Sequence, residues 1–270
     1  MNIFRMKINS YWEKSERQRQ EQAVKSISFY QRRIDLKNAK ILEIGCGNGD
    51  YSIELARTGA FVVSIDIDPG RTQLVRMRAK EEGVNLNVFV GDAQETPFKA
   101  ESYDLILCRH VIEHVSNPEL LIEEMSRILK QGGAIQLTAP NRYSISQIFR
   151  DEHYRLPLVI ILPRKLASFL VCKIFKLEDE YSVSIIPSYR LLKKWTKTRG
   201  LMMQMDLPNR EWIKEKLIHP ERINNRIYRL ILKTASLLFF NRVIAKLVCT
   251  ERITGFFATG WSLWITKQKV

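Results

Sequence analysis

Three glycines stand within five residues of one another, directly behind an apolar run, in the segment KILEIGCGNGDYSIELA at residues 40–56. Glycine permits positive φ and lets the backbone approach a ligand where a Cβ atom would collide. The run before Gly45 indicates a buried strand, and the residues after Gly49 indicate a helix. A strand, a glycine turn and a helix form the first half of a nucleotide-binding unit, in which backbone N–H groups face the ligand.

The spacing of this segment differs from the dinucleotide-binding fingerprint. That fingerprint, G-x-G-x-x-G, needs a glycine at position 50, where this chain has Asp50. The pattern present is E-x-G-x-G-x-G, which runs from Glu43 to Gly49. Taken alone, it fits a nucleotide site or an ordinary glycine turn in an α/β domain.

Two carboxylates follow the next two apolar runs. Asp66 closes the run FVVSID, about 20 residues after the glycines, where a carboxylate accepts hydrogen bonds from ribose hydroxyl groups. Asp68 falls where the next helix starts, so we expect it to cap that helix. Asp92 follows a third run, in GDAQETPF, and is either a ligand contact or the cap of a turn.

Three histidines are candidates for proton transfer, because imidazole titrates near neutral pH. His110 and His114 lie in RHVIEHV, after a fourth apolar run, and His153 lies in RDEHYR. The alternative for His114 is a packing and hydrogen-bonding role. HVIEH also matches the H-x-x-E-H pattern of some zinc proteases, but that reading needs a further ligand on a different fold.

The elements that must position these residues alternate between strands and helices, which predicts right-handed crossovers and a parallel sheet. A leading helix is expected within 3–37, with Trp12, Val24, Ile27 and Tyr30 as its packing residues. Strands are expected at 40–45, 61–66, 86–90, 103–108, 134–139 and 201–208. Helices are expected at 50–58, 70–82, 117–130 and 187–200, and the glycines of KQGG at 130–133 should end the third of these. An aromatic stretch at 255–269 predicts a last, bent strand at the sheet edge.

Four segments arrive together in one order and spacing: E-x-G-x-G-x-G, GDAQETPF, SYDLILCRHVIEHV and ILKQGGAIQLTAPN. Over residues 40–141 the chain resembles the small-molecule branch of the class I methyltransferases, which use S-adenosylmethionine (SAM). The resemblance implies a Rossmann-like, doubly wound α/β sheet of seven strands, with two mostly helical insertions forming a cap. The implied divisions are a helical lead (1–39), a SAM-binding core (40–143), a first cap insertion (144–186), a core helix and strand (187–208), a second basic insertion (209–252) and a C-terminal core strand (253–270).

The resemblance also assigns cofactor contacts. Glu43 and the backbone of 45–49 would surround the amino acid and ribose parts of SAM, Asp92 and Ala93 would meet adenine, and the residues after the fourth strand would line the methionine end. The full set implied is Glu43, Gly45, Cys46, Gly47, Asn48, Gly49, Asp66, Ile67, Asp92, Ala93 and Arg109. Some quinone-precursor O-methyltransferases bind a divalent metal through E-x-x-E-H at this place. Because His110 replaces the first glutamate here, we assign no metal, and the sequence leaves the binding of a divalent ion at 110–114 open.

The charge is divided unevenly along the chain. Residues 1–140 carry 19 basic and 19 acidic side chains, whereas residues 141–270 carry 24 basic and 10 acidic ones, which is the whole net charge of +14. Two segments, 156–176 and 222–248, combine apolar runs with basic residues and are expected either to contact an anionic membrane surface or to form a lid with a solvated basic face. A nucleic-acid partner is disfavoured, because no N-P-P-Y type of loop follows the fourth strand.

These observations predict a SAM-dependent methyltransferase that O-methylates a small or lipid-linked acceptor, such as a glycan precursor or a quinone-type ring. The alternatives are an RNA methyltransferase and a SAM-binding interaction module without catalysis. The four cysteines have no zinc spacing, and the first 20 residues lack the apolar core of a signal peptide. We therefore expect a cytoplasmic protein with peripheral contact to the inner face of the membrane.

Overall fold

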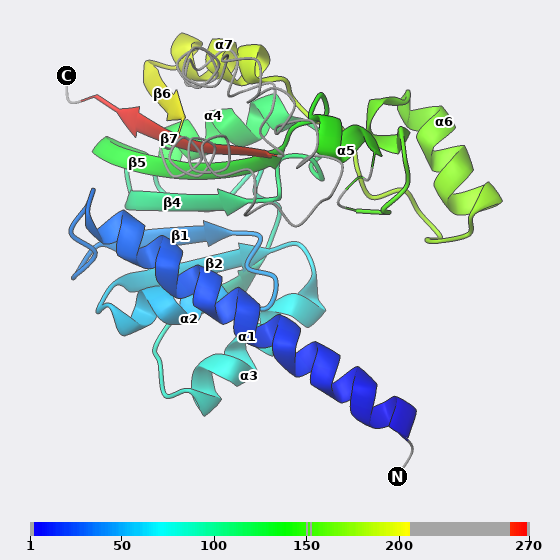
Figure 1. Cartoon of the computed structure of the whole chain (residues 1–270). Helices are drawn as coiled ribbons and strands as arrows, with labels where there is room; N and C mark the ends of the chain where they lie inside the picture. Colours follow the sequence, from blue (N-terminus) through cyan, green and yellow to red (C-terminus); the bar gives the residue numbers. More distant parts are fainter. Residues whose placement is uncertain (1–2, 150, 152, 206–259, 269–270) are drawn as a thin grey trace, which may run out of the picture. The chain divides into compact units, whose positions relative to one another are not determined.

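The computed structural model describes residues 3–149, 151, 153–205 and 260–268, and it contains the expected seven-stranded sheet. The strand order is β3-β2-β1-β4-β5-β7-β6 (Figure 1). The strands are β1 (Lys40–Ile44), β2 (Phe61–Asp66), β3 (Asn87–Val90), β4 (Tyr103–Arg109), β5 (Leu129–Pro140), β6 (Leu201–Met205) and β7 (Gly260–Lys267). The helices are α1 (Ile3–Gln31), α2 (Asp50–Arg57), α3 (Pro69–Glu81), α4 (Pro118–Ile128), α5 (Ile145–Phe149), η1 (Val159–Ile161), α6 (Arg164–Ser168), η2 (Phe169–Ile174) and α7 (Tyr189–Thr198).

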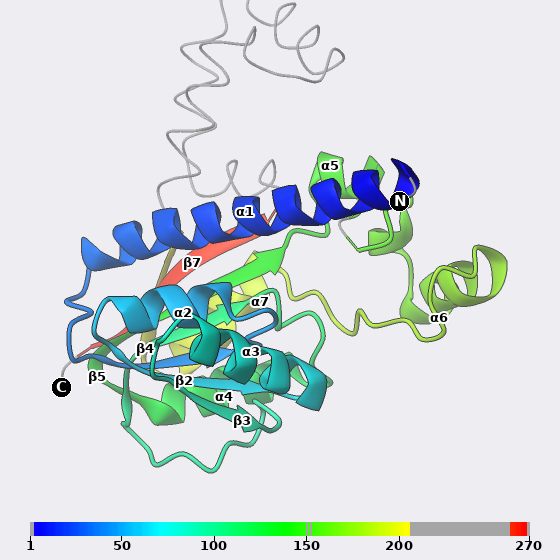
Figure 2. The same ribbon diagram turned by 90° about the horizontal axis from the view of Figure 1, so that it is seen from below.

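The first four strands form the parallel part of the sheet that carries the glycine segment. β1 pairs in parallel with β2 on one side and with β4 on the other, so that Ile41 lies opposite Val62 and Leu105. All three side chains are buried, as expected of strands covered on both faces. Helices α1, α2 and α3 lie on one face of these strands and α4 lies on the other (Figures 1 and 2). β2 and β3 are added on one side of β1 and β4 on the other, so the switch point lies between β1 and β4, where ligands of doubly wound folds bind.

The leading helix is confirmed, but it is shorter than expected and one packing residue is wrong. Ile27 and Tyr30 are buried, whereas the side chain of Val24 is 48% exposed, and the neighbouring Ala23 packs inward in its place. The side chain of Trp12 lies outside the described residues. The helix ends at Gln31 because the following backbone turns, and Asp35 Oδ1 there accepts the N–H of Lys37.

Two further expectations are corrected. The glycines of KQGG do not cap a helix: α4 ends at Ile128, and residues 129–133 already belong to β5. The last carbonyls of α4 accept instead from the loop before β4, since the N–H groups of Glu101 and Ser102 donate to the carbonyls of Arg127 and Ile128. β7 is not an edge strand, because it stands between β5 and β6.

The chain consists of two compact units. The first comprises Met1–Val111, Glu119–Gln136 and Thr266–Val270, and the second comprises Ile112–Pro118 and Leu137–Ile265. The second has its own apolar cluster, formed by Val159, Ile160, Ala167, Val171, Tyr181, Val183 and Ile186. The whole of the expected second insertion, 209–252, lies outside the described residues. Among the described helices, none combines the length and the apolar character needed to cross a bilayer.

Candidate functional site

The three glycines at the end of β1 all adopt positive φ, with values of 71° for Gly45, 51° for Gly47 and 83° for Gly49. The protein itself requires two of them. A Cβ atom on Gly45 would collide with Cγ2 of Val111, and one on Gly49 would lie 3.0 Å from both γ-carbons of Val75. A Cβ on Gly47 would meet no protein atom within 4 Å. The middle of the loop therefore borders open space.

Asp66 ties this loop to the end of β2. Its Oδ2 accepts the N–H of Gly47 at 3.1 Å, and its Oδ1 accepts the N–H of Asp68 at 3.0 Å. The side chain of Asp66 is partly exposed. Asp68 caps α3, as expected, by accepting the N–H of Gly70 at 2.7 Å. Asp66 therefore fixes the glycine loop, whereas Asp68 caps α3.

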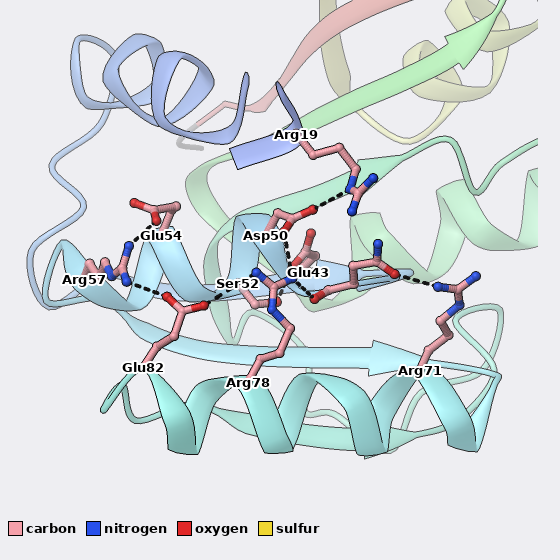
Figure 3. A network of polar contacts seen from close by, with 10 residues as sticks. Arg19, Glu43, Asp50, Ser52, Glu54, Arg57, Arg71, Arg78 and Glu82 are labelled. Carbon is pink, nitrogen blue, oxygen red and sulfur yellow. Dashed lines mark hydrogen bonds and ion pairs between the residues drawn. The ribbon is translucent and has the colours of Figure 1, made fainter. Parts of the chain in front are cut away.

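Arginines from α3 hold the glycine loop from below (Figure 3). Arg78 donates to the carbonyl oxygen of Asn48 at 2.6 Å and to the carboxylate of Asp50 at 2.7 Å. Arg71 donates to Oδ1 of Asn48 at 2.6 Å. Asp50 also accepts from Arg19 of α1 at 3.3 Å, so three helices meet at the first turn of α2.

Glu43 is buried within β1 and does not face solvent, with a side chain only 4% exposed. Its carboxyl accepts a hydrogen bond from the hydroxyl of Ser52, which in turn lies 2.6 Å from the hydroxyl of Ser64. Burial raises the pKa of Glu43 to about 8, against the lowering effect of the Ser52 hydrogen bond. Burial also raises the pKa of Cys46, in the loop itself, to about 12, so that this thiol stays neutral.

The residues expected near adenine lie at the ends of β2 and β3. Ile67 is 72% exposed, which is unusual for a large apolar side chain and suits contact with a flat ring. Asp92 is exposed, and its Oδ1 accepts from the backbone N–H and the side-chain amide of Gln94. Asp92 thus caps a turn, and its Oδ2 also accepts from the side-chain amide of Gln94, at 3.0 Å. Ala93 is buried.

Arg109 and His110 end β4 in the first unit. The guanidinium of Arg109 lies 4.2 Å from the ring centre of Tyr51 and donates to the hydroxyl of Tyr30 and to Gln136 Oε1, both at 3.4 Å. His110 is exposed and has a positive φ of 52°, a backbone conformation that is uncommon outside glycine. Such strain often accompanies a functional position.

His114 and His153 come together in the second unit, although 39 residues separate them. Their ring centres lie 5.2 Å apart in an edge-to-face arrangement. Nδ1 of His114 lies 3.1 Å from the carbonyl oxygen of Ser182, and because a carbonyl oxygen only accepts, Nδ1 is the donor of this hydrogen bond. Asp151 fixes the His153 loop, because its carboxylate accepts the N–H groups of His153, Tyr154 and Leu156.

Glu113 joins the two histidines. One ligand atom from each of Glu113, His114 and His153 lies within 4.8 Å of the others, so the three residues can hold a metal ion. The backbone reinforces the cluster, since the N–H of Ser184 donates to the carbonyl of Glu113 at 2.7 Å. The sequence assigned no metal at 110–114 and left the binding of a divalent ion there open.

Sequence reasoning missed the supporting residues. Arg71 and Arg78 stand seven residues apart on α3, and that spacing, two helical turns, was the available signal that both reach the same loop. Ser182 and Tyr30 carried no local signal, because their partners are far away in the chain.

The loop fits SAM on three observations of this structure. Gly47 borders open space, exposed Ile67 can cover a flat ring, and partly exposed Asp66 offers a carboxylate at the end of β2. Together they form a site for a charged nucleoside.

Comparisons with known proteins agree with this geometry. Residues 42–137 match a family model described as a methyltransferase domain. The ubiquinone biosynthesis O-methyltransferase of Xanthomonas oryzae pv. oryzae (strain PXO99A) is 30% identical over 145 residues, which are 53% of this chain and 61% of that protein. The chain thus matches less than two thirds of that relative's length.

Solved structures support the fold alone. A SAM-dependent methyltransferase from Methanosarcina mazei aligns with a TM-score of 0.53 and 17% identity, over 87% of this chain and 94% of that one. The YcgJ protein from Bacillus subtilis aligns with the same TM-score and 14% identity, over 93% and 100% of the two chains. Residues 42–137 thus match a methyltransferase domain, and the solved structures share its fold.

Proposed function

We propose that the chain is a SAM-dependent O-methyltransferase whose acceptor is a small or lipid-linked molecule. The observation that carries the proposal is the glycine loop, whose central Cβ position is open and whose flanking glycines are forced by the protein's own packing. The relative from Xanthomonas oryzae, an O-methyltransferase by name, supports the choice of oxygen as the methylated atom.

The chain's own residues bind and orient the cofactor. The backbone of residues 45–49 would hold its amino acid and ribose parts, Asp66 would accept from the ribose hydroxyls, and Ile67 with Asp92 and Ala93 would enclose adenine. SAM, when bound, supplies a methyl group on a positively charged sulfur. The remaining task of the protein is to align an acceptor and remove its proton.

His114 is the proposed proton acceptor. Its Nδ1–H donates to the carbonyl of Ser182, which leaves Nε2 to take a proton from an acceptor hydroxyl. His153, edge-on to it, would limit the rotation of the ring, and His110 is the alternative base. The acceptor we favour is lipid-linked, either a quinone-type ring or a glycan precursor, handled at a membrane surface.

A pair of aspartate variants tests the cofactor site. We expect calorimetric titration of SAM to give binding in the micromolar range for the wild type and none for Asp66→Ala. Asp68→Ala is the matched control, because it removes a helix cap worth about 1 kcal/mol but no ligand contact. Folded wild-type protein that does not bind SAM would contradict the proposal and favour an interaction module.

The acceptor is then sought by transfer of labelled methyl from SAM to fractions of a lipid extract. His114→Gln should lose activity while it keeps its affinity for SAM. Methyl transfer to RNA but not to lipid or small-molecule fractions would assign the chain to the runner-up class.

A further inference from the structure

Helices α6 and η2 of the second unit form one continuous element with a fixed inner side. Ala167 and Val171 on this element are fully buried and pack with Val159, Tyr181 and Val183 in the apolar cluster of that unit. Figure 1 shows the element running beside the extended segment that follows it. Its orientation within the unit is therefore set by a core of its own.

The same element and the residue that follows it expose large apolar side chains. Leu166 is 46% exposed, Phe169 52%, Ile174 55% and Phe175 52%. Single exposed apolar residues are ordinary, but four within ten residues, two of them phenylalanines, form a patch that indicates a binding partner.

Exposed basic side chains occur in the same segment as these apolar residues. Arg164, Lys165, Lys173 and Lys176 are exposed, and no acidic residue occurs between positions 153 and 177. The segment without acidic residues ends at an exposed acidic run, Glu178, Asp179 and Glu180.

We propose that the face formed by Leu166, Phe169, Ile174 and Phe175, with the four basic residues of the same segment, docks on the surface of an anionic lipid bilayer. The phenylalanines and aliphatic side chains enter the boundary between headgroups and acyl chains, and the basic residues meet lipid phosphates. Nucleic acid fits less well, because exposed isoleucine and leucine side chains gain nothing from a phosphate backbone. The inference deepens the proposed function, since it brings the enzyme to a lipid-linked acceptor.

Vesicle flotation of the full chain tests the docking face without SAM or acceptor. The probes are vesicles of equimolar phosphatidylcholine and phosphatidylglycerol, and vesicles of phosphatidylcholine alone. We expect flotation with the anionic vesicles only, and we expect high salt to reduce it. Because SAM titration is a separate measurement, failure of the docking face and failure of the cofactor site are distinguishable.

Three paired variants sharpen the test. Phe169→Ser with Phe175→Ser, and Lys173→Glu with Lys176→Glu, should each lower the bound fraction by about tenfold. Met77→Ser with Leu120→Ser removes exposed apolar side chains elsewhere and should bind as wild type. Replacing the acidic run, by Glu178→Gln, Asp179→Asn and Glu180→Gln, should strengthen binding. Circular dichroism and an unchanged affinity for SAM establish that each variant is folded.

Two results would overturn the proposal. One is equal flotation of the wild type and the phenylalanine variant. The other is binding to single-stranded RNA that the lysine variant loses and the phenylalanine variant keeps, which would assign the face to nucleic acid.

Discussion

Gly45, Gly47 and Gly49 share positive φ angles but differ in what surrounds them. Gly45 is enclosed by Val111, whereas Gly47 borders no protein atom that a methyl group would touch. One glycine is thus needed for packing, and the other keeps space for a ligand. Alanine substitutions can separate these two requirements.

We expect Gly45→Ala to lower the free energy of unfolding by about 2 kcal/mol or more, through collision and backbone strain. Gly47→Ala should cost only about 1 kcal/mol, from its positive φ, but should abolish measurable SAM binding. Denaturant unfolding and calorimetric titration measure the two effects. Unimpaired SAM binding by Gly47→Ala would show that the glycine loop is not part of the cofactor site.

Glu43 predicts a pH dependence of stability. Burial raises its folded pKa to about 8, above its usual unfolded value of about 4.5, so the folded state holds an extra proton between these values. The stabilisation is complete below the lower pKa and is lost as the pH rises through the higher one.

Glu43→Gln mimics the protonated carboxyl and should flatten this profile. Apo wild type should lose on the order of 5 kcal/mol relative to the variant between pH 4.5 and 8. Parallel unfolding curves across that range would mean that Glu43 is not neutral in the folded protein.

The proton-transfer role proposed for His114 leads to a prediction about metal removal. Because we assign this residue to proton transfer, a strong chelator should leave the methyl transfer rate unchanged. A divalent ion that copurifies in stoichiometric amount, and is lost in His153→Ala, would instead assign Glu113, His114 and His153 to a metal site.

At the scale of elements, α3 supports the cofactor loop through its arginines. Arg78 is only 12% exposed and bridges Asp50 and the backbone of Asn48, whereas Arg57 of α2, 47% exposed, pairs with Glu54 and Glu82 at the surface (Figure 3). Buried charge-assisted hydrogen bonds contribute more than surface ion pairs.

Arg78→Gln should therefore weaken SAM binding by about tenfold, because the loop loses a fixed carbonyl and Asp50 loses a partner. Arg57→Gln is the matched control and should change stability by about 0.5 kcal/mol or less. Equal affinities of the two variants for SAM would show that α3 does not fix the conformation of the glycine loop.

The sequence predicted most elements of the parallel sheet because their signals are local. The cap at Asp68 and the alternation of apolar strands with helices depend on neighbouring residues. The position of β7 between β5 and β6 depends on residues that are far apart in the sequence. The same is true of the contact between His114 and His153, which are 39 positions apart. The prediction that Val24 packs inward was wrong because the apolar periodicity of α1 is weak. The buried residue is the neighbouring Ala23, which has a smaller side chain. The cofactor and catalytic roles of the individual residues stay predictions.

At the scale of the whole molecule, cofactor binding should increase the free energy of unfolding. A ligand that binds only the folded state at a hundred times its Kd adds about 2.7 kcal/mol to the free energy of unfolding. Thermal unfolding with SAM should show this gain in wild type and not in Asp66→Ala. The same shift in both proteins would mean that SAM binds elsewhere.

The cysteines divide into protected and accessible thiols. Cys46 and Cys108 are buried, and Cys46 is neutral at any ordinary pH, whereas Cys172 on η2 is partly exposed. Once Cys249, which lies outside the described residues, is replaced by serine, a maleimide dye should react at one position. Its emission would then report in real time when the α6–η2 segment leaves water.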